Sequence, residues 1–96
     1  GKNTIKFKNI TIDLDSKEIK KNDEVVFLTQ KEYELLLFLV KNKNKIIPSS
    51  TIEEQLWSNE EYINSNVIQV TIYNLRKRLG KDIVKSFRGL GYKIEI

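Results

Sequence analysis

The stretch Asn66–Leu79, NVIQVTIYNLRKRL, restricts the possible folds of this chain more than any other segment. Its apolar residues recur at spacings of four, three and four, which predicts a helix with one buried stripe. Gly80 follows directly and predicts the end of that helix, because glycine adopts a left-handed backbone at the least cost. The stripe consists of Ile68, Ile72, Leu75 and Leu79, and the opposite face carries Asn66, Gln69, Val70, Tyr73, Asn74 and Lys77. Such a helix suits a DNA major groove, but an ordinary amphipathic surface helix has the same pattern.

The distribution of charge narrows the class of partner. The 96 residues suit one small domain, and their net charge is +4. Residues 1–65 carry ten Lys against eleven acidic residues, whereas residues 66–96 carry seven Lys or Arg against Asp82 and Glu95. The positive excess therefore lies in the last third, as expected for a chain that binds a polyanion. An acidic protein or a membrane surface would fit the charge alone.

Missing residue types exclude several kinds of chemistry. The chain has no cysteine and no histidine, so disulfides, the usual zinc sites and histidine-based catalysis are excluded. It also has no glycine-rich loop of the kind that cradles phosphate. No apolar run approaches the ~18 residues that span a bilayer. We therefore expect a protein that is not an enzyme and that uses no cofactor and no metal.

Residues 1–28 have the pattern of short strands. Apolar and polar residues alternate over 5–8 and 10–14, and 18–20 and 24–28 supply a third and a fourth strand between turn-forming residues. This pattern predicts a small antiparallel sheet with one buried face. The candidates for that face are Ile5, Phe7, Ile10, Ile12, Leu14, Ile19, Val25 and Phe27.

Capping signals predict where the helices begin. Thr29 and Glu32 form a capping box at the start of a helix that runs to about Asn42. Ser49 or Ser50 is expected to cap a second helix, with Ser50 and Glu53 as another capping box. Ile46 and Ile47 suggest a very short strand before it. Asn64 or Ser65 is expected to cap the third helix.

The chain ends with two alternating segments around a glycine-bearing turn. Residues 83–87 and 92–96 alternate in polarity and flank Arg88-Gly89-Leu90-Gly91. This pattern predicts a hairpin with a basic tip.

The order of these elements and four short motifs resemble the OmpR/PhoB family, the effector domains of two-component response regulators. The motifs are Leu28-Thr29-x-x-Glu32-x-x-Leu35-Leu36-x-x-Leu39, Leu56-Trp57, Val70-x-Ile72-x-x-Leu75-Arg76-Lys77-Arg78-Leu79 and Arg88-Gly89-x-Gly91-Tyr92. The resemblance implies an α+β fold: a winged helix-turn-helix preceded by a four-stranded antiparallel sheet. By this resemblance the chain is a single domain, 1–96, composed of an N-terminal β-meander (1–28), a three-helix core (29–79) and a wing hairpin (80–96).

The resemblance also implies how the residues would contact DNA, with the third helix in the major groove and the wing over a minor groove. Base readout is expected from Val67, Gln69, Val70, Tyr73 and Asn74. Phosphate contacts are expected from Trp57, Asn66, Thr71, Arg76, Lys77, Lys85, Ser86 and Tyr92. Arg88 is the candidate for the minor groove. Trp57 and Tyr92 are equally compatible with core packing, and the polar face of the helix with plain solvent exposure.

Amides and a valine at the base-reading positions favour an A/T-rich site. The sequence departs from the family's usual residues at Pro48, Ser58, Asn66, Gln69, Thr71 and Asn74, which leaves the DNA consensus open.

The expected partners follow from the same resemblance. They are double-stranded promoter DNA, a second copy head-to-tail on direct repeats, and RNA polymerase at Glu60, Glu61 and Tyr62. An N-terminal receiver domain would lie outside this chain, and the protein would be cytoplasmic without a membrane partner. Two alternatives keep the fold: a membrane-anchored one-component regulator, and a winged helix used for protein–protein contact.

Overall fold

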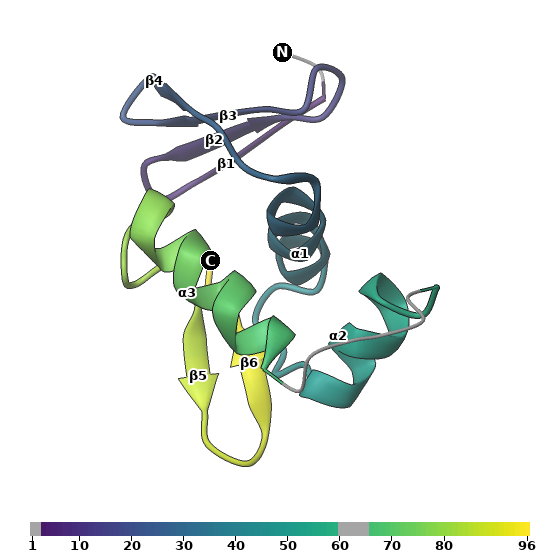
Figure 1. Cartoon of the computed structure of the whole chain (residues 1–96). Coiled ribbons are helices and arrows are strands. Elements are labelled where there is room, and N and C mark those ends of the chain that lie inside the picture. The colour runs from purple at the N-terminus through teal and green to yellow at the C-terminus, as the bar shows by residue number, and fades with distance from the viewer. Residues whose placement is uncertain (1–2, 60–65) are drawn as a thin grey trace.

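The chain folds into a sheet, three helices and a hairpin, in that order. The computed structural model describes residues 3–59 and 66–96. Its elements are β1 (Thr4–Phe7), β2 (Ile10–Asp13), β3 (Glu18–Lys21), β4 (Glu24–Val26), α1 (Gln30–Lys41), α2 (Ser49–Leu56), α3 (Val67–Leu79), β5 (Lys85–Phe87) and β6 (Gly91–Lys93). In Figure 1 the β1–β4 sheet lies at one end, the helices lie in the middle, and the β5–β6 hairpin projects at the other end. The predicted winged-helix architecture with an N-terminal antiparallel sheet is confirmed.

The register of the N-terminal sheet explains its buried face. The strands pair antiparallel in the order β1-β2-β3-β4. Ile5 lies opposite Ile12, Ile12 opposite Ile19, and Ile19 opposite Val26, so one apolar row crosses all the strands. Because cross-strand neighbours share a face, this row turns together toward the helices.

The prediction that Val25 and Phe27 face the core is wrong. Val25 is 44% exposed and Phe27 is 82% exposed, whereas Val26 and Leu28 pack against the core. The cause lies in the turn between β3 and β4, where Asn22 and Asp23 both have positive φ (52° and 67°). A two-residue turn of this kind fixes the register, and a change of one residue moves every side chain to the other face.

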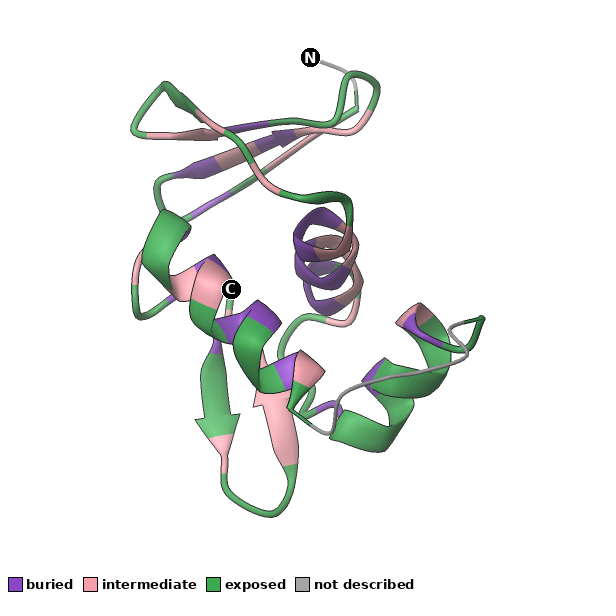
Figure 2. Ribbon diagram, in the orientation of Figure 1, coloured by how far each residue is buried: buried purple, intermediate pink, exposed green. Residues whose placement is uncertain are grey.

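Helices α1 and α3 form the centre of the core. Leu35, Leu36 and Leu39 of α1 are buried, and the predicted stripe of α3 is buried with them. Figure 2 shows that α1 and α3 are buried on the sides that face each other, while α3 exposes its outer side. The stripe predicted from the sequence is therefore confirmed.

A buried carboxylate joins the start of α1 to the last turn of α3. The predicted capping box is present, with the Glu32 amide donating to Thr29 Oγ1 (3.2 Å) and the Thr29 amide donating to Glu32 Oε1 (3.0 Å). Glu32 is only 3% exposed, and Arg78 Nε lies 3.0 Å from the same Oε1. A buried carboxylate is costly unless it is paired, so this contact fixes α3 against α1.

The starts of α2 and α3 differ from the prediction. Pro48 occupies the N-cap of α2 and no side chain caps it, so the predicted Ser50–Glu53 capping box is wrong. The helix begins two residues earlier than the box requires, which places Ser49 and Ser50 inside it. The N-cap of α3 is Asn66, and the predicted caps Asn64 and Ser65 lie outside the described residues.

The hairpin is attached to the core through the segment between α1 and α2. The Ile47 amide donates to the Tyr92 carbonyl (2.8 Å) and the Tyr92 amide donates to the Ile47 carbonyl (3.0 Å), as the predicted short strand requires. Gly91 has φ of 143°, and an added Cβ would overlap the Ile47 carbonyl and lie 2.6 Å from its carbon. Glycine is therefore needed here for close approach as well as for backbone conformation.

We expect Glu32→Ala to lower the free energy of unfolding by about 2–3 kcal/mol, because it removes a cap and leaves Arg78 unpaired. Glu34→Ala is the matched control: Glu34 is less buried than Glu32 and lies 2.8 Å from Gln30 and 3.4 Å from Lys31. That variant should change stability by less than about 0.5 kcal/mol. Urea unfolding measures both, and equal effects of the two variants would contradict a structural role for Glu32.

We expect Gly91→Ala to destabilise the domain by about 1–3 kcal/mol more than Gly89→Ala, because the new methyl group has no space beside Ile47. Gly89 also has positive φ (76°), but nothing lies within 4 Å of an added Cβ there. Gly89→Ala therefore reports the conformational cost alone. Thermal unfolding compares the variants, and coincident transitions would show that the close approach carries no energy.

Candidate nucleic-acid interface

The outer face of α3 offers amide, aromatic and cationic groups to solvent. Asn66, Gln69 and Lys77 are exposed. Val70 is 47% exposed and Tyr73 is 64% exposed, so both side chains are accessible to a partner. Asn74 is partly buried at the margin of this face. The helix thus brings together most of the side chains that the sequence predicts for base readout.

Three predicted contact residues pack inward instead. The Thr71 side chain is buried, and its hydroxyl donates to the Val67 carbonyl one turn earlier (2.8 Å). Val67 itself packs partly against the core. Trp57 is 5% exposed, and Lys31 Nζ lies 5.3 Å from its ring centroid. The structure therefore gives Thr71 an internal hydrogen bond and Trp57 a packing role, and their phosphate contacts stay predictions.

Two further predicted phosphate contacts bind each other. Arg76 Nη2 donates to Ser86 Oγ (2.8 Å) and to the Val84 carbonyl (2.8 Å), and Nε donates to the same carbonyl (3.2 Å). These hydrogen bonds join α3 to the beginning of β5. The sequence gives no sign of them, because residues eight to ten positions apart meet here only through the fold.

The wing presents a cation and an apolar side chain at its tip. Arg88 is exposed, and Leu90 is 62% exposed. Tyr92, two residues further on, is partly buried against the core. The predicted placement of Arg88 at an accessible tip is thus confirmed, while Tyr92 combines core packing with an accessible edge.

A groove of about 480 Å³ joins the start of α2, the outer face of α3 and the wing. It is lined by Pro48, Ser49, Ser50, Gln69, Ser86, Phe87, Arg88, Gly89, Leu90, Gly91 and Tyr92. Four predicted site residues, Gln69, Ser86, Arg88 and Tyr92, therefore border one concave surface. The sequence prediction missed Ser49, Ser50 and Leu90, because the two serines were interpreted as helix caps.

Two lysines of the wing are paired with a single acidic residue. Glu95 Oε1 lies 2.6 Å from Lys85 Nζ, and Glu95 Oε2 lies 2.7 Å from Lys93 Nζ. Hydrogen bonds from the Lys85 and Lys93 ammonium groups lower the pKa of Glu95 from 4.5 to about 2. The pKa of Lys85 is raised, first by its hydrogen bond to Glu95 and then by the charge of that carboxylate. Lys85, a predicted phosphate ligand, is thus ion-paired with Glu95 in this structure.

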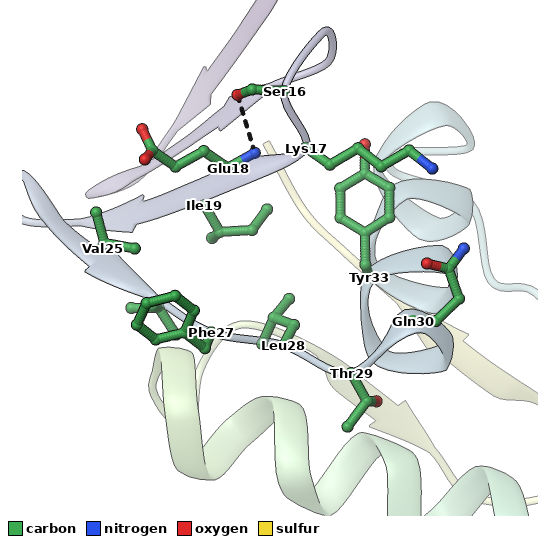
Figure 3. A pocket seen from close by; sticks show the side chains of 11 residues that line it. Ser16, Lys17, Glu18, Ile19, Val25, Phe27, Leu28, Thr29, Gln30 and Tyr33 are labelled. Carbon is green, nitrogen blue, oxygen red and sulfur yellow. Dashed lines mark hydrogen bonds between the residues drawn. The ribbon is translucent and has the colours of Figure 1, made fainter.

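A second hollow, of about 310 Å³, is lined by residues between Ser16 and Tyr33, in the N-terminal part of the chain. Figure 3 shows it between β3, β4 and the start of α1, with Ile19, Phe27, Leu28 and Tyr33 along its wall. None of the predicted site residues lines it. The candidate RNA polymerase contacts Glu60, Glu61 and Tyr62 lie outside the described residues.

The part of the chain that the structure describes contains no candidate metal site and no candidate membrane span. Residues 3–59 and 66–96 contain no group of three or more His, Cys, Asp or Glu that could hold a metal ion. Within the same ranges, no helix has the length and apolar character needed to cross a bilayer.

Comparisons with known proteins agree with this geometry. Residues 23–94 match the family model described as "Transcriptional regulatory protein, C terminal". The transcriptional regulatory protein QseB of Haemophilus influenzae is 36% identical over 88% of this chain and 38% of its own length. The transcriptional regulatory protein SrrA of Staphylococcus aureus is 30% identical over 100% of this chain and 42% of its own length. The chain therefore spans about two fifths of these relatives.

Solved structures show the same fold. The Thermotoga maritima response regulator DrrB, an OmpR/PhoB homologue, superposes with a TM-score of 0.88 at 25% identity, over 98% of this chain and 45% of that one. The DNA-binding domain of Klebsiella pneumoniae RstA, solved with the RstA box, has a TM-score of 0.83 at 24% identity over 96% of each chain.

The fold and the exposed α3–wing surface define a winged-helix domain. The family match covers most of its length. The chain belongs to the family of C-terminal domains of transcriptional regulatory proteins, and its fold is that of an OmpR/PhoB-type response-regulator domain.

We expect the Glu95 carboxyl to titrate near pH 2, and its pKa to rise toward 4.5 when Lys85 and Lys93 are both changed to Gln. Because folding lowers this pKa, the stabilisation from the two ion pairs is complete above the unfolded pKa and is lost as the pH falls through the folded value. NMR titration of the side-chain carboxyl measures both values. A wild-type midpoint near 4.5 would show that the ion pairs do not persist in solution.

Proposed function

We propose that this domain binds double-stranded promoter DNA with α3 in the major groove and the β5–β6 wing over an adjacent minor groove. The observation that carries this proposal is the groove shared by α2, α3 and the wing, which Gln69 and Arg88 both line. One duplex lying against this surface would meet the helix face and the wing tip together. The positive excess of residues 66–96 lies in the same elements and favours a polyanion.

Base readout would come from the exposed face of α3. Gln69 and Asn74 carry amides, which pair well with adenine through its N6 and N7 atoms. Val70 offers an apolar surface suited to the thymine methyl group, and Tyr73 extends the same face. Val67 would contribute only through its partly exposed edge. These side chains favour an A/T-rich recognition site.

Phosphate contacts would come from accessible polar groups around that face. Asn66 at the N-cap of α3 and Lys77 within the helix are exposed, and Tyr92 borders the groove. Lys85 would bind a phosphate by giving up its ion pair with Glu95. Trp57 would contribute only by donating its indole N–H. Arg88 would enter the minor groove, whose negative potential is strongest where A/T pairs narrow it.

The whole protein would be a cytoplasmic two-component response regulator with an N-terminal receiver domain. Its domains would bind head-to-tail on direct repeats, so that two weak half-sites give one specific site. Glu60, Glu61 and Tyr62 remain the candidates for an RNA polymerase contact. The role we propose for this domain is binding and not catalysis.

We expect selection from a random duplex library to recover an A/T-rich half-site. Asn74→Ala should alter the preferred base at one position, because it removes an amide that would hydrogen-bond to a base edge. Arg88→Ala should weaken binding by about tenfold and lower the preference for A/T pairs beside the half-site. Sequencing of the recovered duplexes and titration at fixed salt measure both effects.

Lys6→Ala is the matched control for Arg88→Ala, because it removes one positive charge from an exposed position on β1. It should leave the recovered sequences unchanged. Binding that depends on salt but yields no consensus would contradict sequence-specific recognition by this domain alone. Negligible affinity even at low salt would favour a winged helix used for protein–protein contact.

A further inference from the structure

The wing is attached to the rest of the domain on both of its strands. On the β6 side, two backbone hydrogen bonds connect Tyr92 to Ile47. On the β5 side, a side chain makes the connection: Arg76 of α3 donates to the Val84 carbonyl and to the Ser86 hydroxyl. Arg88, the proposed minor-groove residue, follows only two positions after Ser86. The position of the wing tip relative to α3 therefore depends on what holds Val84 and Ser86.

The geometry of the Arg76 guanidinium suits positioning better than phosphate binding. Two of its nitrogens, Nε and Nη2, are directed at acceptors at the start of the wing, Val84 just before β5 and Ser86 within it, with donor–acceptor distances of 2.8–3.2 Å. Such a planar fork holds two acceptors in a fixed relation, which a lysine ammonium cannot reproduce. Arg76 is also partly buried, whereas Lys77, the next residue, is exposed on the outer face.

We infer that Arg76 is a positioning residue, which holds the wing at the angle from α3 that lets Arg88 reach the minor groove while α3 occupies the major groove. This inference rests on the proposed function. A duplex fixes the distance between its two grooves, so a wing held at one angle reaches its groove without first being ordered. Binding would then avoid the entropic cost of immobilising a mobile hairpin.

The charge-preserving variant Arg76→Lys separates positioning from phosphate binding. A phosphate ligand would be largely rescued by lysine, because the charge remains. A positioning residue would not be rescued, since lysine cannot hold Val84 and Ser86 together. Lys77→Gln is the matched control, because it removes a neighbouring charge that makes no such connection.

The decisive measurement is a double-mutant cycle with Arg88→Ala, read as duplex affinity at fixed salt. We expect Arg88→Ala to weaken binding by about tenfold in the wild-type background and in Lys77→Gln, but by less than about threefold in Arg76→Lys. Ser86→Ala removes one of the two acceptors of Arg76. In that background the effect of Arg88→Ala should lie between the wild-type value and the value in Arg76→Lys. A tenfold effect of Arg88→Ala in every background would overturn the inference.

A second measurement needs no DNA. Backbone ¹⁵N relaxation should show greater mobility for residues 88–90 in Arg76→Lys than in the wild type or in Lys77→Gln. Unchanged mobility in all variants would overturn the positioning role. If the wild-type domain bound no duplex, the proposed function would fail, and the relaxation data would still decide whether Arg76 holds the wing.

Discussion

The burial of the Glu32 carboxylate is the interaction on which the rest of the structure depends. A charge in the core is tolerated only when donors surround it, and here the donors come from the start of α1 and from Arg78 in the last turn of α3. The contact therefore caps one helix and fixes the angle of another. Because α3 carries the exposed face proposed to read DNA, a local capping interaction determines how that face is presented.

The same helix also fixes the wing. Arg76 holds the beginning of β5, while Gly91 allows β6 to lie directly against Ile47. The two arginines on either side of Lys77 thus contact different parts of the domain: Arg78 contacts α1 and Arg76 contacts the wing. Lys77 between them is left on the outer face. In a sequence these three cations look alike, and only their direction around the helix distinguishes them.

Charge pairing within the fold also changes what the net charge implies. Of the basic residues in the last third, Arg78 is paired with Glu32, and Lys85 and Lys93 share Glu95. The positive potential available to a duplex is therefore more localised than the composition suggests. Lys77, Lys81 and Arg88 remain exposed, and of these Arg88 lines the groove together with Gln69. This concentration favours a docking orientation rather than general attraction to any polyanion.

The sequence by itself determined the elements, the buried stripe of α3, the capping box at Thr29 and the resemblance to the family, because these depend on short-range periodicity and local hydrogen bonds. It also predicted an accessible Arg88. Tertiary structure alone decided that Thr71 packs inward, that Arg76 binds the wing, and that Phe27 faces solvent. The physical reason differs between them. The partner of a long side chain such as Arg76 depends on residues that the whole fold brings together. The register of β4 depends on the backbone conformation of the Asn22–Asp23 turn, which the alternation of polar and apolar residues does not specify.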